Sequence, residues 1–230
     1  MAAFLSAITE SWQASLSTAL LPEHFARVGV VIPTFRRPES LRRAVLSAGP
    51  GVPVAVVSDD GPPGLDVIQA AEGETACLLH GDGNHGASWA RNRGVETLAL
   101  CEWVQFLDDD DLLVGGWREW LLPHLADGVD AVVCSAFTPG EHALSIDESV
   151  FTSQVCVRRE SFLAVGGFRE GLTWAEERDL LARMAGRGMA VRRVPLPLVF
   201  RPVRGGSGEP EAAPAVMEGA AVSRAGRGGF

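Results

Sequence analysis

The sequence predicts an α/β domain with a mostly parallel central sheet flanked by helices. Apolar, β-branched runs alternate with segments of helical spacing four times before residue 112, which is typical of strand and helix units along a parallel sheet. Acidic segments follow two of these predicted strands, and ligands collect at the carboxyl ends of the strands in such sheets. With 230 residues, 47% of them apolar, the chain is long enough to build one sizeable core.

The first half of the chain supplies the parallel strands. The segment VGVVIPT at 28–34 predicts a buried strand, because β-branched residues dominate it and Pro33 closes it. The segment PESLRRAVLSA at 38–48 has helical spacing and a proline in its first turn. Strands are then expected at 52–57, 77–80 and 101–107, with a helix at 87–100.

The second half continues the alternation. We expect helices at 116–125 and 174–188, strands at 130–137 and 189–201, and a strand followed by a helix within 149–168. The helix at 174–188 has acids in its first turn and glycines at its end, as dipole and capping preferences favour.

Three parts are expected along the chain. Residues 1–26 form an N-terminal extension in which Phe4, Ile8, Trp12, Leu16 and Leu20 recur at spacings of four, which predicts an amphipathic accessory helix. Residues 27–204 form the domain. Residues 205–230, rich in glycine, alanine, proline and glutamate, form a flexible tail.

The composition excludes several function classes. A formal charge of −9 disfavours nucleic acid and anionic membranes as partners. No run reaches the roughly 18 apolar residues that a transmembrane segment needs. The four dispersed cysteines lack the spacing of a zinc site and are read as buried free thiols. We therefore expect a soluble, cytoplasmic protein.

The segment FLDDDDLL at 106–113 places four aspartates where a buried strand ends. Neighbouring carboxylates repel one another and lose hydration near a core, so such a cluster needs a cation or full exposure to water. Two carboxylates one residue apart on an extended segment point the same way and can bind one hard cation, such as Mg²⁺ or Mn²⁺. A solvated acidic loop is the alternative.

Five segments, in this order, resemble family 2 glycosyltransferases of the GT-A fold. They are VGVVIPTFRRPESLRRAV, VAVVSDDG, GASWARNRGVETL, WVQFLDDDDLL and GGFREGLTWAEERDLLARM, and the resemblance covers about residues 28–204. It implies a single Rossmann-like GT-A domain that binds a nucleoside diphosphate sugar donor. The membrane helices and the Gln-x-x-Arg-Trp motif of processive synthases are missing from this sequence, so single transfer to a small-molecule or carrier-bound acceptor is expected.

The resemblance also implies roles for individual residues. Asp60 would hydrogen-bond a pyrimidine base, Asp109 would lie near the ribose, and Asp110, together with Asp108, would bind Mn²⁺ or Mg²⁺. Asp111 is expected to cap a helix or to support the metal ligands. The nucleotide-binding residues implied in this way are Pro33, Thr34, Arg36, Asp60, Arg91, Asn92, Asp108 and Asp109.

The general base is expected in the segment AEERD, where the family usually carries Glu-Asp at the start of a helix. The second of these positions is Glu177, one methylene longer than aspartate, with Glu176 as the reserve candidate and Asp179 as a weaker one. Without a catalytic role, these acids are simply favourable residues near a helix N-terminus. Arg201 and Arg204 fall where the family often has a basic loop over the diphosphate, and Trp174 is a candidate wall for the sugar or acceptor.

The sequence therefore predicts a metal-dependent, inverting glycosyltransferase that uses a UDP or dTDP sugar and an acceptor hydroxyl or amine. A nucleotidyltransferase is one alternative, although a Gly-rich basic phosphate loop early in the chain would be usual for that class. A catalytically inactive nucleotide-sugar-binding partner is the other, suggested by the glutamate in place of aspartate and by the N-terminal helix. The prediction allows a homodimer.

Overall fold

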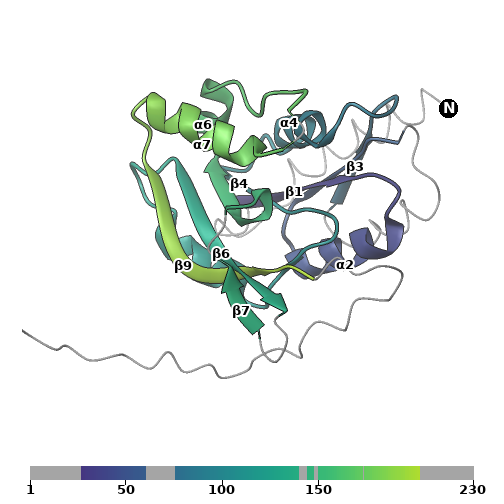
Figure 1. The fold of residues 1–230 in the computed structure, drawn as a ribbon, viewed down its shortest axis with the longest axis horizontal. Helices are drawn as coiled ribbons and strands as arrows, with labels where there is room; N and C mark the ends of the chain where they lie inside the picture. The colour runs from purple at the N-terminus through teal and green to yellow at the C-terminus, as the bar shows by residue number, and fades with distance from the viewer. Residues whose placement is uncertain (1–26, 61–75, 140–143, 148–149, 173, 203–230) are drawn as a thin grey trace, which may run out of the picture.

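The computed structural model of the protein describes residues 27–60, 76–139, 144–147, 150–172 and 174–202. These residues form one α/β domain around a single curled sheet (Figure 1). The strands of the sheet are β1 (Val28–Thr34), β2 (Val54–Ser58), β3 (Ala76–His80), β4 (Trp103–Phe106), β5 (Leu112–Leu113), β6 (Ala131–Pro139), β7 (Leu144–Asp147), β8 (Val155–Arg158) and β9 (Val191–Phe200). Their order across the sheet is β3-β2-β1-β4-β8-β6-β9-β5, with β7 paired to β6.

The N-terminal half of the sheet is parallel, as predicted. β1 pairs in parallel with β2 and β4, and β2 pairs in parallel with β3. Every residue of β1 is buried, which explains why a continuous run of apolar residues at 28–34 predicted this strand with its observed bounds.

The C-terminal half of the sheet is mixed and differs from the expected mostly parallel arrangement. β8 lies antiparallel between β4 and β6, β7 is antiparallel to β6, and β5 is antiparallel to β9, whereas β6 and β9 are parallel. Two parallel strands need a long crossover connection between them. Within the described residues, no α-helix lies between β6 and β8, and a short 3₁₀ turn, η2 (Thr152–Gln154), leads directly into β8. Two short strands of this half, β5 and β7, were not predicted.

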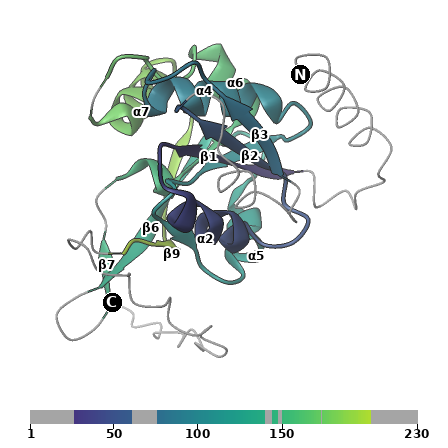
Figure 2. The ribbon, with the colours of Figure 1, turned by 90° about the vertical axis from the view of Figure 1, so that its right-hand side faces the viewer.

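Helices cover both faces of the sheet (Figures 1 and 2). The helices α4 (Ala87–Thr97), α6 (Arg159–Ala164) and α7 (Glu176–Gly186) lie over one face, and α2 (Pro38–Ala48) and α5 (Trp117–Leu121) lie over the other. Side chains of β1 alternate between the two buried clusters, with Val30 and Ile32 facing α2 and Val31 facing α4. The helix expected at 116–125 divides into α5 and the 3₁₀ turn η1 (Leu122–His124), since Pro123 cannot donate a helical hydrogen bond.

A close contact between α4 and β1 fixes the position of α4. A Cβ atom at Gly94 would lie 2.5 Å from Cγ1 of Val31, which is closer than real side chains approach one another. Glycine therefore lets the helix backbone pack directly on the strand. The same helix carries Arg91 toward the edge where β1 and β4 end.

Several predictions concern residues outside the described ranges or minor features of the fold. The amphipathic extension at 1–26 and the tail at 205–230 lie outside the described residues. Cys101, Cys134 and Cys156 are buried free thiols as predicted, whereas Cys77 is only partly buried. Within the described residues, no helix is both long and apolar enough to cross a membrane.

Candidate active site

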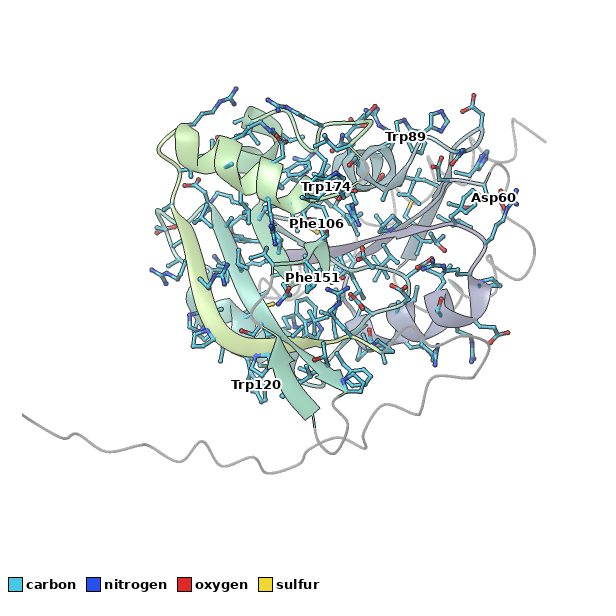
Figure 3. All side chains as sticks on the ribbon, viewed as in Figure 1. Asp60, Trp89, Phe106, Trp120, Phe151 and Trp174 are labelled. Carbon is cyan, nitrogen blue, oxygen red and sulfur yellow. The ribbon has the colours of Figure 1, made fainter. Side chains whose placement is uncertain are left out.

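Three strand ends form the candidate active site. β1, β2 and β4 run in parallel, so the segments that follow Thr34, Ser58 and Phe106 lie at one edge of the sheet. Figure 3 labels Asp60, just beyond the end of β2, and Phe106, the last residue of β4. The acidic segments of the sequence are therefore at the carboxyl ends of strands, where the prediction expected them.

The four aspartates at 108–111 divide into two groups. One carboxylate oxygen from each of Asp108, Asp110 and Asp111 lies within 4.8 Å of the others. Asp109 instead turns toward β1, where its Oδ2 accepts a hydrogen bond from Oγ1 of Thr34 at 2.8 Å. The structure thus brings together the predicted pair Asp108 and Asp110, adds Asp111 to them, and separates Asp109.

Arg37 joins the two groups. Its Nη1 donates to Oδ1 of Asp109 at 3.2 Å and to Oδ2 of Asp110 at 2.9 Å. Desolvation lowers the pKa of Arg37, but the attraction of the two aspartates outweighs it and raises the pKa overall. Burial raises the pKa of Asp109, while Thr34 and Arg37 offset part of this shift. No role was predicted for Arg37.

Asp108 is fixed through both its side chain and its backbone. Nη2 of Arg91 donates to Oδ1 of Asp108 at 2.7 Å, and the backbone N–H of Asp108 donates to Oγ of Ser153 at 2.9 Å. Arg91 is buried, and its guanidinium lies 5.5 Å from the ring centroid of Phe168. Arg91 and Asp108, both predicted to bind the nucleotide, therefore form an ion pair at the floor of the site.

Asp111 is the most buried acid of the segment, with 3% of its surface exposed. Its Oδ2 lies 3.5 Å from Nε of Arg201, and the guanidinium of Arg201 lies 3.5 Å from the ring centroid of Phe151. Burial and then the charge of Asp108 raise the pKa of Asp111 to about 7, and Arg201 offsets only part of this shift. The site therefore holds an acid that resists ionisation unless a further cation approaches.

The expectation that Asp111 caps a helix is wrong. The helix that follows, α5, begins at Trp117 after Gly116, so Asp111 is too far from its N-terminus to accept a capping hydrogen bond. Instead, Leu112 and Leu113 enter the sheet as β5, which pairs with β9 and brings Arg201 beside Asp111.

The residues present fit a hard divalent cation. Asp108, Asp110 and Asp111 offer only carboxylate oxygens, which Mg²⁺ and Mn²⁺ prefer. A buried oxygen, Oδ2 of Asp111, makes no hydrogen bond within the described part of the chain. A cation among these three groups would offset the burial and the repulsion by Asp108 that together raise the pKa of Asp111.

The two aspartates after β2 differ in their surroundings. Asp59 is buried; its Oδ2 accepts the backbone N–H of Gly86 at 2.6 Å, and its Oδ1 lies 3.0 Å from Nδ1 of His85. Asp60 is exposed and accepts from Nε of Arg36 at 2.9 Å. Asp59 therefore anchors the loop that leads into α4, and Asp60, the predicted partner of the base, is the one that a ligand can reach. The role of His85 was not predicted.

Asn92 ties α4 to the loop before α7. Its side-chain amide donates to the carbonyl of Phe168 at 3.0 Å and to Glu170 at 3.1 Å, and it accepts the backbone N–H of Phe168 at 2.9 Å. Both ends of the amide are thus engaged within the protein. The nucleotide contact expected for Asn92 stays a prediction.

The acids at the start of α7 lie in three different environments. Glu177 is buried, and its Oε2 lies 3.4 Å from Oγ1 of Thr152. Glu176 is partly exposed. Asp179 forms an ion pair with Arg183, one turn later in α7, at 2.8 Å. Its carboxylate is therefore already paired within the helix. Glu177 and Glu176 therefore stay the candidates for the base.

The turn η2 contacts both the acidic segment and the start of α7. Thr152 donates to Glu177, and Ser153 accepts from the backbone of Asp108. Neither residue was predicted. The signal available in the sequence is the run TSQ, three polar residues directly before an apolar strand, all three of which are buried in the structure.

Trp174 precedes α7 and lies on the surface. Its side chain is 77% exposed, and Ala175 after it has a φ of 57°. This exposure suits the predicted wall for a sugar or an acceptor. Pro33 lies buried in β1, and Arg204 lies outside the described residues.

Known proteins share this sequence pattern. The model of glycosyl transferase family 2 matches residues 29–154. Pre-mycofactocin glycosyltransferases of two Mycobacterium tuberculosis strains, CDC 1551 / Oshkosh and H37Rv, are each 30% identical in an alignment 201 residues long that covers 75% of this chain and 42% of theirs. The chain thus spans less than half the length of these curated relatives.

Solved structures share the fold. S. aureus TarS superposes with a TM-score of 0.63 at 15% identity, over 76% of this chain and 36% of that one. Residues 1–349 of TarS in complex with UDP-GlcNAc give a TM-score of 0.62 at 14% identity, over 78% of this chain and 59% of that one. The shared architecture is the GT-A fold. Because the family model also matches more than half of its residues, the chain belongs to family 2 of the glycosyltransferases.

Proposed function

We propose that this domain is a metal-dependent, inverting glycosyltransferase that moves a sugar from a UDP or dTDP donor to an acceptor hydroxyl or amine. The observation that carries the proposal is the division of the acidic segment. Asp108, Asp110 and Asp111 converge within 4.8 Å, while Asp109 faces Thr34. One segment thus offers a cation site for a diphosphate and a separate carboxylate for the nucleoside.

Donor binding would use the side chains along the three strand ends. Asp60 is our candidate for the pyrimidine base because it is exposed at the end of β2, and Asp109 is our candidate for the ribose. Arg91, buried beside Asp108, would hold that carboxylate in place. The remaining proposed contacts are those of Pro33, Thr34, Arg36 and Asn92.

Asp110 and Asp108 would hold the cation, with Asp111 as an additional oxygen donor. A bound Mn²⁺ or Mg²⁺ would offset the negative charge that develops on the departing diphosphate. Asp110 and Asp108 are similarly accessible, with 24% and 22% of their side chains exposed, compared with 4% for Asp111. Asp108 is already paired with the buried Arg91, so Asp110 is the ligand that we expect to matter most.

Glu177 is the proposed base, with Glu176 in reserve. Its carboxylate would take the proton of the acceptor hydroxyl while the acceptor oxygen forms a bond to C1 of the sugar. The bond from C1 to the diphosphate oxygen would break on the opposite face, and its electron pair would leave with the nucleoside diphosphate. This single displacement inverts the configuration at C1.

The comparisons support a UDP sugar as the first donor to test. TarS 1-349 has been crystallised in complex with UDP and with UDP-GlcNAc. Because TarS is only 14% identical to this chain, the choice of donor here stays a proposal, as do the acceptor, a homodimer and a cytoplasmic location. Membership in a glycosyltransferase family also leaves the nucleotidyltransferase alternative without support.

A catalytically inactive nucleotide-sugar-binding partner is the second candidate. It is favoured by the glutamate at position 177, which is longer than the aspartate usual in the family and already contacts Thr152. Such a protein would bind the donor but would not release its sugar.

Hydrolysis of the donor separates the two candidates. Release of UDP or dTDP from a panel of UDP- and dTDP-sugars is measured with Mn²⁺ for the wild-type protein and for Glu177→Gln, with water as the acceptor. The transferase proposal predicts release that falls at least a hundredfold in Glu177→Gln, in line with the contribution of a general base. Glu160→Gln, at an exposed acid of α6, is the control and should match the wild type. Donor binding without release by either protein would favour the inactive binder.

A further inference from the structure

Glu177, the proposed base, has a longer side chain than the usual aspartate, and a neighbouring residue can fix the position of its carboxylate. Glu177 occupies a position where aspartate is usual in the family, and a glutamate carboxylate extends about 1.5 Å farther, the length of one carbon–carbon bond. A carboxylate displaced by that distance would attack the acceptor proton from the wrong place, because catalysis depends on a close approach of the reacting atoms. A contact within the protein must therefore hold Glu177 in a conformation that keeps its carboxylate closer to the backbone of α7.

Thr152 lies where it can do this. Its hydroxyl donates to Oε2 of Glu177 at 3.4 Å, and 5% of Thr152 and 7% of Glu177 are exposed. On the other side of the carboxylate, Nε of Arg178 lies 3.9 Å from Oε1, and this arginine is largely exposed. The buried threonine is thus the fixed contact, and the exposed arginine is the adjustable one.

The turn that carries Thr152 is held rigidly. The backbone N–H of Phe151 donates to Oε1 of Gln154 at 2.8 Å, and Nε2 of Gln105 on β4 donates to the carbonyl of Ser153 at 2.7 Å. The next hydroxyl of the turn, that of Ser153, accepts the backbone N–H of Asp108 at 2.9 Å. One rigid turn therefore fixes Glu177 relative to the acidic segment.

We propose that Thr152 is a positioning residue for Glu177. The hydroxyl of Thr152 holds the carboxylate of this longer side chain where the carboxylate of an aspartate would lie. This inference rests on the proposed function, since it takes Glu177 as the base. It concerns the orientation of the base and leaves the donor-binding residues untouched. Removal of the hydroxyl should therefore lower kcat and leave KM for the donor unchanged.

Three single variants and one double variant of the full chain test the proposal. Donor hydrolysis with Mn²⁺ is measured for Thr152→Val, which keeps the shape and loses the hydroxyl, for Thr152→Ser, for Glu177→Asp, and for Thr152→Val combined with Glu177→Asp. We expect kcat to fall about tenfold in Thr152→Val, with KM and the affinity for UDP with Mn²⁺ within twofold of the wild type. Thr152→Ser, which restores the hydroxyl, should recover most of the lost turnover. Thr97→Val, which removes a hydroxyl that donates to the carbonyl of Arg93 within α4 at 3.1 Å, is the control and should keep the wild-type kcat.

The double variant separates positioning from a general loss of structure. If Thr152 acts by restraining the longer side chain, Thr152→Val should change kcat less than twofold in the Glu177→Asp background, because aspartate needs no restraint. A tenfold loss in both backgrounds, or an equal loss in Thr152→Ser and Thr152→Val, would overturn the inference. Failure of the proposed function gives a different result: the wild type and Glu177→Gln would then both bind the donor without releasing UDP or dTDP, and the Thr152 variants would do the same.

Discussion

Nη1 of Arg37 lies 2.9 Å from Oδ2 of Asp110, so the carboxylate that we expect to bind the metal already contacts a cation of the protein. A divalent cation has to compete with this guanidinium for Asp110. In Arg37→Gln, we therefore expect Mn²⁺ to bind more tightly in the absence of nucleotide. Because half of the Arg37 side chain is exposed, the gain should be only about two- to fivefold.

Calorimetric titration with Mn²⁺ measures this effect. Arg42→Gln, at an exposed position of α2, the helix that begins directly after Arg37, serves as the control and should leave the affinity unchanged. The difference between Arg37→Gln and the wild type should shrink at high salt, since exposed charges are screened. Weaker Mn²⁺ binding in Arg37→Gln would mean that Arg37 supports the cation site and does not compete with it.

The raised pKa of Asp111 predicts how stability depends on pH. In the unfolded chain this carboxyl ionises near pH 4, whereas in the folded protein its pKa is about 7. Between these values the folded state binds more protons, so the free energy of unfolding falls as the pH rises. In EDTA, the melting temperature of the wild type should therefore decrease from pH 5 to pH 8, and this decrease should be smaller in Asp111→Asn. Asp127→Asn, at an exposed acid, should follow the wild type, and the account is contradicted if Asp111→Asn does so too.

The hydroxyl of Ser153 holds the start of the acidic segment through the backbone of Asp108. Ser153→Ala would leave the backbone N–H of Asp108 without the acceptor that it has at 2.9 Å, at a cost of about 1–3 kcal/mol. We expect a lower melting temperature together with weaker Mn²⁺ binding. The control is Ser161→Ala on α6, which removes a hydroxyl that donates to Asp130 at 2.5 Å. It should lower the melting temperature and leave the Mn²⁺ affinity unchanged. Equal Mn²⁺ affinity in Ser153→Ala and the wild type would show that the contact is only structural.

The packing of α4 on β1 predicts an unusual effect of alanine in a helix. Alanine is favoured over glycine by about 1 kcal/mol in a helix interior, yet a Cβ at Gly94 would lie 2.5 Å from Cγ1 of Val31. Gly94→Ala should therefore destabilise the protein by about 1–3 kcal/mol, or about 3 to 10 °C in melting temperature. Val31→Ala in the same protein should recover part of this loss. Gly186→Ala, where a Cβ meets nothing within 4 Å, should be neutral or slightly stabilising.

The sequence predicted best the parts of the fold that local patterns determine. β1 and α2 have their predicted bounds, because one is a continuous buried run and the other begins with Pro38 in its first turn. In the mixed half of the sheet, β6, β8 and β9 were predicted as strands, but their antiparallel pairings and the short strands β5 and β7 were not. β5 has only two residues and is held by β9, a strand far along the chain, so its own sequence carries no periodic signal.

The positions of the candidate site residues at strand ends could be predicted from the sequence, but their contacts could not. The aspartates at 108–111 were expected at a strand end and lie there, but their division into two groups depends on Thr34 and Arg37, which are 75 and 73 residues away from their partners. The same holds for Thr152 and Glu177, 25 residues apart, which are brought together only when η2 and α7 pack on the sheet. Such pairs follow from the tertiary structure, and a single sequence does not reveal them.

The position of the metal in a crystal of the protein soaked with UDP and Mn²⁺ tests the central claim most directly. Anomalous scattering identifies the Mn²⁺ ion, and the density of UDP shows which groups bind the base and the diphosphate. We predict that the ion is ligated by Asp110 and by oxygens of the diphosphate, with Asp60 facing the base. Mn²⁺ bound at any place other than Asp110 would contradict it.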